Sequence, residues 1–311
     1  MSFLKIASRS LIPLCALFAG LPTQAGNATL MHAAQWCAKL TPRLPGISNS
    51  LCQDSKLMPT GASSLRGFPL LARQIPAAKA ARAKPPLRVL LMGGIHGDEL
   101  TSSSIVFRWM QRMNTPEAQQ FEWSVMPVVN PDGLLARRAT RVNADGVDLN
   151  RNFPTPDWEK DAPKYWKLRT RRDPRRYPGP APLSEPESRW VNDEMVRFRP
   201  DVIISVHAPY GLLDFDGSVS PPHKFGRLVL NQVGVYPGSL GNYSGVHKNV
   251  PVITIELPNA QKMPTEAEVR RIWIDMLHWI NGHVVSQSEM VKKTRSAALP
   301  ASQELPLHLQ R

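Results

Sequence analysis

Acidic residues, cysteines and long apolar runs are all scarce in this chain of 311 residues. It carries 25 Asp and Glu against 38 Lys and Arg, and only three cysteines. The apolar run at residues 11–20 is too short to span a bilayer comfortably. There is no internal repeat and no obvious linker in the middle of the chain. The length therefore suits one large α/β domain or two small ones.

The first 25 residues are typical of a cleavable export signal. Lys5 and Arg9 precede the apolar run, and Thr23–Ala25 places small residues where a signal peptidase cuts. We expect cleavage after Ala25, export, and no membrane association afterwards. A retained N-terminal anchor is the alternative interpretation.

Cleavage would remove Cys15 and leave Cys37 and Cys52. An even number of cysteines in an exported chain favours a disulfide, here within an N-terminal segment spanning residues 26–60. Two free thiols are the alternative. Neither cysteine lies near the histidine-containing segments described below, so we do not interpret them as metal ligands.

The net charge of +13 suits an anionic partner. For an exported protein, an acidic cell-wall polymer or an anionic peptide fits better than nucleic acid. Much of the positive charge lies in residues 164–176, together with Tyr165 and Trp166. The simplest interpretation of that stretch is a solvated surface loop.

Buried strands are predicted at four apolar runs. They are residues 87–92, 121–129, 201–206 and 250–257. Because helical patterns alternate with these strands, we predict an α/β fold with a mixed, largely parallel sheet flanked by helices on both faces. It would occupy a main domain at residues 61–285, followed by a disordered tail at 286–311.

Helices are predicted where apolar residues recur at spacings of three and four. Residues 100–113 show this pattern directly after the first strand. Ser184 and Thr265 each begin a capping-box pattern, and the helix behind Ser184 is expected to reach about Phe198. Residues 72–86 are expected to form an exposed loop, and residues 134–183 an irregular segment.

Three side chains match the ligands of a catalytic zinc site. His96 and Glu99 lie three residues apart on the turn after the first strand, and His207 follows another strand. Two histidines and one carboxylate leave a fourth position of one zinc ion open for water. His-x-x-Glu alone is a weak signal. Asp148 is the natural partner to orient a ligand histidine.

Several short segments in a fixed order resemble the zinc metallocarboxypeptidase family. These segments are Gly94–Glu99, Asn130–Gly133, Asp148–Pro154 and Thr254–Leu257. Within the family, the chain is most similar to the murein tripeptide amidase branch. The features of that branch are Arg141–Val147, Ser184–Glu187 and Pro237–Gly241. The similarity covers residues 60–285 and implies a metallocarboxypeptidase-like α/β/α fold.

The resemblance also implies roles for individual residues. His96, Glu99 and His207 would bind zinc. Asn150 and Arg151 would hold the free carboxylate of the residue that is released, as a guanidinium fork matches a carboxylate.

Four further roles follow from the resemblance. Arg141 would stabilise the oxyanion, and Glu256 would act as general base and then general acid. Tyr236 is favoured over Tyr243 as the assisting tyrosine. Leu240 would line the pocket for the released side chain, and its apolar character argues against release of Lys or Arg.

The preferred hypothesis is a monomeric, periplasmic zinc amidase that cuts the γ-D-glutamyl–meso-diaminopimelate bond of a murein-derived peptide. The alternatives are a general zinc carboxypeptidase on ordinary peptides, an N-acyl amino acid deacylase, and an inactive wall-binding protein. The Asn130–Gly133 turn argues against the deacylase. The complete set of ligands and base argues against an inactive protein.

Overall fold

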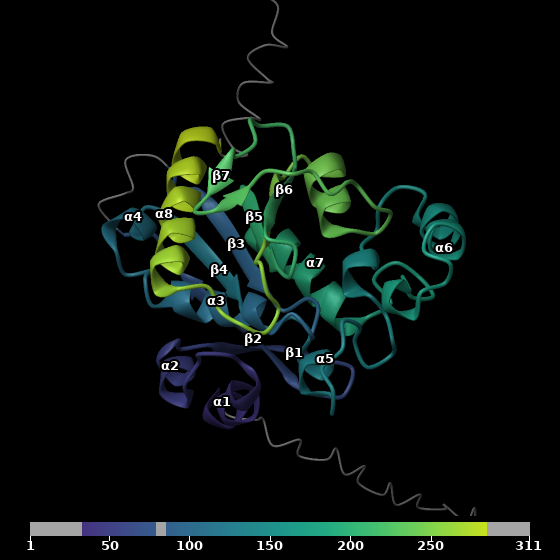
Figure 1. The fold of residues 1–311 in the computed structure, drawn as a ribbon, viewed down its shortest axis with the longest axis horizontal. Helices are drawn as coiled ribbons and strands as arrows, with labels where there is room; N and C mark the ends of the chain where they lie inside the picture. The colour runs from purple at the N-terminus through teal and green to yellow at the C-terminus, as the bar shows by residue number, and fades with distance from the viewer. Residues whose placement is uncertain (1–32, 79–84, 285–311) are drawn as a thin grey trace, which may run out of the picture. The chain divides into compact units, whose positions relative to one another are not determined.

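A mixed sheet of seven strands forms the centre of the computed structural model, which describes residues 33–78 and 85–284 (Figure 1). The strand order is β1-β2-β4-β3-β5-β9-β6. The expected signal at residues 1–25 and tail at 286–311 lie outside the described residues. Within those residues, no helix is both long enough and apolar enough to cross a membrane.

The four predicted strands form the parallel centre of this sheet. They are β3 (Arg88–Gly93), β4 (Glu122–Met126), β5 (Val202–His207) and β9 (Val252–Glu256). Every residue of β5 is buried, which is why its sequence is a continuous apolar run ending in a histidine.

Antiparallel strands extend the sheet at both edges. They are β1 (Met58–Ser63), β2 (Pro69–Ile75) and β6 (Leu212–Asp216). A separate hairpin consists of β7 (Lys224–Phe225) and β8 (Leu228–Val229). The predicted mixed sheet is confirmed, and its parallel part is confined to the four central strands.

Helices cover both faces of the sheet, as predicted (Figure 1). α3 (Leu100–Met110) and α8 (Glu266–His283) pack on one face, where Val89 and Leu91 of β3 point. α7 (Pro186–Phe198) packs on the other, where Leu90 and Met92 point. Alternate residues of a strand face opposite sides, so one apolar strand supplies both cores.

Shorter helices complete the fold. They are α1 (Ala33–Leu40), η1 (Thr41–Arg43), α2 (Asn49–Asp54), α4 (Pro116–Gln119), α5 (Pro131–Leu135), η3 (Leu149–Arg151), α6 (Trp158–Leu168), η4 (Pro174–Arg176) and η5 (Gly241–His247). α6 lies in the stretch predicted to be irregular, and it contains Pro163. β2 extends to Ile75, so the prediction of a loop is wrong for residues 72–75.

The two predicted helix caps have different outcomes. The Thr265 hydroxyl accepts a hydrogen bond from the Glu268 backbone at 3.3 Å, so Thr265 caps α8 as predicted. The prediction for Ser184 is wrong, because Glu185 occupies the N-cap position of α7. Glu187 instead accepts hydrogen bonds from the Leu65 backbone and the Asn143 side chain.

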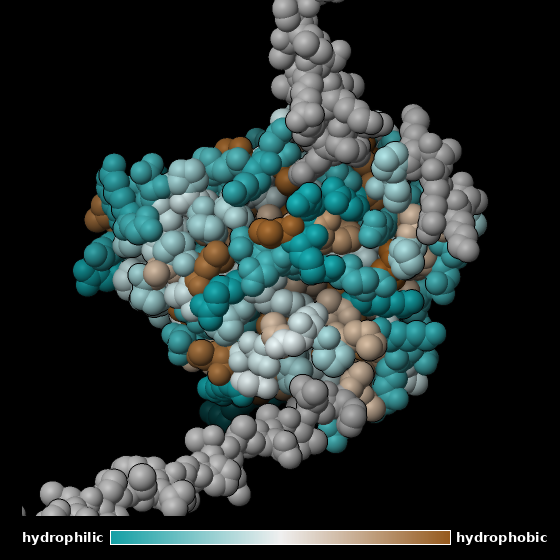
Figure 2. Space-filling view, turned by 180° about the vertical axis from the view of Figure 1, so that it is seen from behind, coloured by the Kyte–Doolittle hydropathy of each residue, from teal (hydrophilic) through white to brown (hydrophobic). Residues whose placement is uncertain are grey.

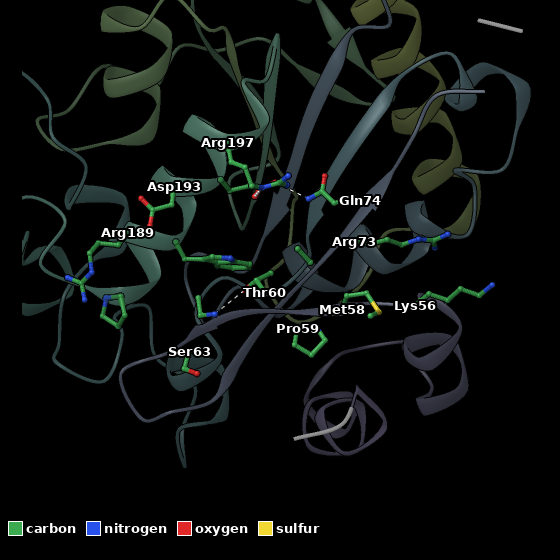
Figure 3. A pocket seen from close by; sticks show the side chains of 15 residues that line it. Lys56, Met58, Pro59, Thr60, Ser63, Arg73, Gln74, Arg189, Asp193 and Arg197 are labelled. Atoms are coloured by element: carbon green, nitrogen blue, oxygen red, sulfur yellow. Dashed lines mark hydrogen bonds and ion pairs between the residues drawn. The ribbon is translucent and has the colours of Figure 1, made fainter. Parts of the chain in front are cut away.

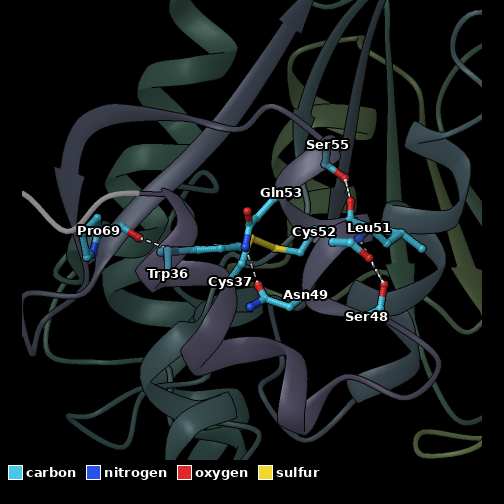
Figure 4. The surroundings of a disulfide bond; sticks show 10 residues. Trp36, Cys37, Ser48, Asn49, Leu51, Cys52, Gln53, Ser55 and Pro69 are labelled. Carbon is cyan, nitrogen blue, oxygen red and sulfur yellow. Dashed lines mark hydrogen bonds between the residues drawn. A yellow bond between two sulfur atoms is a disulfide. The ribbon is translucent and has the colours of Figure 1, made fainter.

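A disulfide between Cys37 and Cys52 joins α1 to α2 (Figure 4). The neighbouring Trp36 donates a hydrogen bond of 2.9 Å to the Pro69 carbonyl on β2. Both helices contribute to the same core as α3 and α8. The domain boundary expected at residue 60 falls inside β1. Because α1 and α2 share a core with α3 and α8, residues 33–57 pack as part of the main domain.

One face of the molecule is largely polar. Figure 2 shows hydrophilic residues over most of one face, with apolar residues scattered between them. Isolated exposed apolar side chains such as Leu168 and Val196 are usual on a folded protein.

Candidate active site

The structure brings His96, Glu99 and His207 together at the carboxyl ends of two adjacent strands. His96 and Glu99 lie on the turn between β3 and α3, and His207 is the last residue of β5. Because β3 and β5 are parallel neighbours, both ends open on the same edge of the sheet. One ligand atom from each residue lies within 4.8 Å of the other two.

The spacing of these atoms fits a zinc ion. His96 Nδ1 lies 2.8 Å from Glu99 Oε1, and His207 Nδ1 lies 3.1 Å from Glu99 Oε2. The two Nδ1 atoms are 3.2 Å apart. Tetrahedral zinc with bonds of ~2.1 Å sets its ligand atoms about 3.4 Å apart. The three side chains could therefore hold zinc with small adjustments.

The other ring nitrogens are held by polar partners. His96 Nε2 lies 3.1 Å from Asp148 Oδ1, and His207 Nε2 lies 3.0 Å from Ser205 Oγ. These contacts turn both Nδ1 atoms towards the common centre. The role of Asp148 was predicted. Ser205 was missed, although it stands two residues before His207 and so faces the same side of β5.

Arg141 lies between the carboxylates of Asp148 and Glu99. Its Nε donates to Asp148 Oδ2 at 3.0 Å, and its Nη1 lies 3.5 Å from Glu99 Oε1. Burial opposes ionisation of Asp148, but Arg141 and His96 outweigh it and hold its pKa well below the usual range. Burial also opposes ionisation of Glu99, and His96 with His207 hold its pKa low.

Glu256 ends β9 directly beside His207. It lines the same cavity as His96 and Arg141, and burial raises the pKa of its carboxyl group. The Tyr210 backbone approaches Glu256 Oε2 at 3.5 Å. A buried carboxylate with a raised pKa, close to the metal ligands, is suited to accept and return a proton.

Arg151 lines this cavity and carries an unsatisfied hydrogen-bond donor. It is buried, and its Nε has no hydrogen-bond partner in the part of the chain that the structure describes. Its Nη1 donates to the Asn150 carbonyl at 2.6 Å, and burial lowers the pKa of its guanidinium to about 10. Leaving a buried guanidinium donor unpaired is unfavourable, so this geometry indicates an anionic ligand.

The turn at Gly238 places Tyr236 over Arg151. Gly238 has a φ of +75°, and a Cβ atom there would overlap the Arg151 carbonyl. The Tyr236 ring lies 4.6 Å from the Arg151 guanidinium carbon, and its hydroxyl donates to the Val233 carbonyl. Tyr243, the other candidate, packs in the core and donates its hydroxyl to Asn192.

Leu240 does not lie where the resemblance places it. Its side chain is buried in the core beneath α7, and its backbone donates to Asn150 Oδ1 at 2.8 Å. The cavity is lined instead by charged side chains that the sequence reasoning missed. These are Arg176, Asp214 and Asp216. The prediction that Leu240 makes this pocket apolar is therefore wrong, and the pocket gives no reason to exclude release of Lys or Arg.

A larger groove of about 880 Å³ runs along β1, β2 and α7 (Figure 3). It contains none of the predicted site residues. Arg197 in this groove pairs with Glu194 at 2.6 Å, and Arg189 donates to two backbone carbonyls. The groove is larger, but its lining contains none of the metal-ligand, arginine and glutamate side chains found at the strand ends.

The chain is similar to known peptidases and amidases. The sequence profile of the zinc carboxypeptidase family matches residues 54–215. Murein peptide amidase A of Escherichia coli (strain K12) is 30% identical over 228 residues, covering 70% of this chain and 87% of that protein.

Two solved structures show the likeness in fold. Thrombin activatable fibrinolysis inhibitor has a TM-score of 0.57 at 20% identity, covering 80% of this chain and 72% of that one. Carboxypeptidase A from Helicoverpa armigera has a TM-score of 0.55 at 16% identity, covering 73% and 68%.

Proposed function

Because the chain belongs to the zinc carboxypeptidase family and is therefore a hydrolase, we propose that it is an exported murein peptide amidase. It would hydrolyse the γ-D-glutamyl–meso-diaminopimelate bond. The observation that carries the proposal is the buried, unpaired Nε of Arg151, a residue that lines the same cavity as His96 and His207. Such a site cuts a bond next to a free carboxylate.

The metal ligands and their partners suit one zinc ion. Zinc bound there would supply a Lewis acid that polarises a carbonyl and lowers the pKa of water to about 7. The chain's contribution is orientation. Asp148 and Ser205 fix the two imidazoles, and Arg141 fixes Asp148 in turn.

Four side chains would handle the substrate. Arg151 and Asn150 hold the free carboxylate of the released residue, with Tyr236 stacked on the guanidinium. Arg141 donates to the oxyanion, which is typically worth ~3–4 kcal/mol. Glu256 takes the proton of the attacking water and passes it to the leaving amine.

The similarity to murein peptide amidase A supports the choice of a murein peptide. The export signal predicted at residues 1–25 supports a periplasmic location, where the protein would act as a monomer on wall peptides. A general zinc carboxypeptidase would use the same carboxylate clamp, so the substrate test below has to separate the two.

The test compares two substrates with the mature, zinc-loaded protein. One is L-Ala-γ-D-Glu-meso-diaminopimelate, and the other is an ordinary peptide with a free C-terminus. Mass spectrometry should show release of diaminopimelate from the first alone. Trimming of the ordinary peptide alone would overturn the murein proposal.

A Glu256→Gln variant tests the mechanism in the same assay. We expect kcat to fall by at least ~100-fold, because general acid–base catalysis contributes that much or more. Zinc content and peptide binding should remain. Glu117→Gln, a change on α4 outside the cavity, is the matched control. Unchanged hydrolysis in Glu256→Gln would refute the assigned base.

A further inference from the structure

The cavity beside Arg151 runs along one face of β6 and β9. Asp214 and Asp216 stand two residues apart on β6, so both face the same side as Leu212. In the register with β9, Leu212 pairs with Glu256, Asp214 with Thr254, and Asp216 with Val252. Two strand residues span about 7 Å, so Asp214 lies about 7 Å and Asp216 about 14 Å along β6 from Leu212, the residue opposite Glu256.

Both aspartates are built into this part of the cavity. Asp214 is 8% exposed, and its Oδ1 accepts hydrogen bonds from the backbones of Phe215 at 3.0 Å and Val233 at 3.1 Å. The Asp216 carboxylate lies against Gly241, where any Cβ atom would overlap its Oδ2. Glycine at the start of η5 is thus what allows Asp216 to face the cavity.

The two carboxylates have no cationic partner of their own. Across residues 33–78 and 85–284, neither forms an ion pair with Lys, Arg or His, and the Asp216 carboxylate accepts no hydrogen bond. Burial raises the pKa of Asp214, and burial together with the charge of Asp214 raises that of Asp216 to about 6. Two adjacent carboxylates, Asp214 buried and Asp216 partly buried, favour a cationic ligand.

Arg151, which lines the same cavity, requires a ligand of the opposite charge. Arg151 has its buried, unpaired Nε, which indicates a carboxylate ligand. One amino acid can meet both requirements if its α-carboxylate binds Arg151 and its side chain ends in an ammonium group. The side chains of lysine and diaminopimelate both carry such a group.

Resting on the proposed function, we propose that Asp214 and Asp216 bind the side-chain ammonium group of the amino acid that the enzyme releases. They select substrates ending in diaminopimelate or lysine over those whose last side chain lacks an amine. A carboxylate pair that lines a substrate cavity disfavours a neutral side chain, because the bound side chain removes water from the pair without supplying a partner.

Binding of the released amino acid tests this separately from catalysis. The zinc-loaded Glu256→Gln protein is titrated calorimetrically with lysine, norleucine, meso-diaminopimelate and 2-aminopimelate. In each pair the second compound lacks only the distal amine. The amine-bearing compounds should bind at least tenfold more tightly at pH 7.5. Equal binding within both pairs would overturn the inference.

Variants then assign the preference to the two aspartates. Asp216→Asn and Asp214→Asn should each reduce the ratio of lysine to norleucine affinity at least fivefold. Asp193→Asn removes the same charge from the exposed surface of α7 and should leave the ratio unchanged. Asparagine retains an acceptor for the backbone hydrogen bonds of Asp214, so that variant is expected to fold. An unchanged ratio in both variants would refute the assignment.

Hydrolysis separates this inference from the proposed function. If γ-D-glutamyl peptides resist cleavage but ordinary peptides ending in lysine are cleaved in preference to those ending in norleucine, the murein substrate is wrong and the ammonium site stands. If the murein tripeptide is cleaved and the Asp214→Asn/Asp216→Asn protein still prefers it over the 2-aminopimelate analogue, the ammonium site is wrong and the amidase stands.

Discussion

Most buried charges of the catalytic centre are held by partners of opposite charge. Arg141 contacts Asp148 and Glu99, and Glu99 contacts both ligand histidines. Buried charges arranged in this way keep fixed positions, because each would lose its compensation if it moved. Among the exceptions, the Arg151 Nε atom and the Asp214–Asp216 pair are where a ligand is needed.

The unpaired charge on Asp216 should lower stability. Its carboxyl has a pKa of about 6 in the folded protein against 3.8 in a free chain. A raised pKa means that ionisation of Asp216 destabilises the folded state. This destabilisation is complete above about pH 6 and absent below pH 3.8. After allowance for its partial exposure, Asp216→Asn should raise the free energy of unfolding by about 1–2 kcal/mol at pH 7.5.

This gain should fade as the pH falls from 6 towards 4. Urea unfolding of the metal-free protein at pH 7.5 and at pH 4 measures the gain. A gain that is as large at pH 4 as at pH 7.5 would contradict the electrostatic explanation. A loss of stability at pH 7.5 would show that Asp216 has a partner in the folded protein.

At the scale of elements, the site depends on turns that hold one segment against another. Asp148 caps η3 by accepting from the Asn150 backbone, which sets the start of the Asn150–Arg151 clamp. The Gly238 carbonyl accepts from the Phe153 backbone at 3.0 Å, which fixes the Tyr236 turn against the end of η3. Backbone contacts therefore position both the Asn150–Arg151 clamp and the Tyr236 turn.

A Gly238→Ala substitution should damage this clamp more than the backbone strain alone explains. Its φ of +75° costs any other residue ~1–2 kcal/mol, and the added Cβ would also displace the Arg151 carbonyl. We expect KM for the C-terminal carboxylate substrate to rise at least tenfold. Gly61→Ala on β1 has a similar φ of +84° but open space around it, and should leave KM unchanged. Equal effects in both variants would contradict this account.

The α1–α2 pair is a second element with a definite contribution. The Cys37–Cys52 disulfide closes a loop with a sequence separation of 15. Replacing both cysteines by serine should lower the free energy of unfolding by ~3 kcal/mol, since loops of this length contribute about that much. Urea denaturation measures the loss, and reduced wild-type protein should match the variant. Zinc affinity should not change, and a lost zinc site would mean that the pair supports the active site.

For the whole molecule, the decisive feature is that three parallel strands end side by side. The carboxyl ends of β3, β5 and β9 deliver His96, His207 and Glu256 to one edge of the sheet. Residues more than 100 positions apart in the chain thereby share one site. The site can form only when the sheet is complete, so zinc binding and folding should be coupled.

Zinc should therefore stabilise the protein against unfolding. At a free concentration 1,000-fold above its dissociation constant, the gain is ~4 kcal/mol if the unfolded chain does not bind it. Thermal unfolding with zinc and with a chelator measures the difference. His96→Ala should abolish the gain, whereas His278→Ala, on the exposed face of α8, should retain it. A full gain in His96→Ala would place the metal elsewhere.

The sequence by itself determined the features that depend on neighbouring residues. Apolar runs located the four central strands, and the polar residues that follow them identified His96, His207 and Glu256 as strand-end groups. The amphipathic pattern behind Thr265 located α8. These features are local because strand burial, helix periodicity and capping act over a few residues.

Only the tertiary structure decided which side chains face the cavity. β6 alternates aspartates with Leu213 and Phe215, and its role became clear only from its pairing with β9. Leu240 and Tyr243 turn into the core beneath α7, while Tyr236 lies over Arg151. Such orientations depend on which segments, distant in sequence, pack together. The charge of the pocket was therefore not readable from the chain alone.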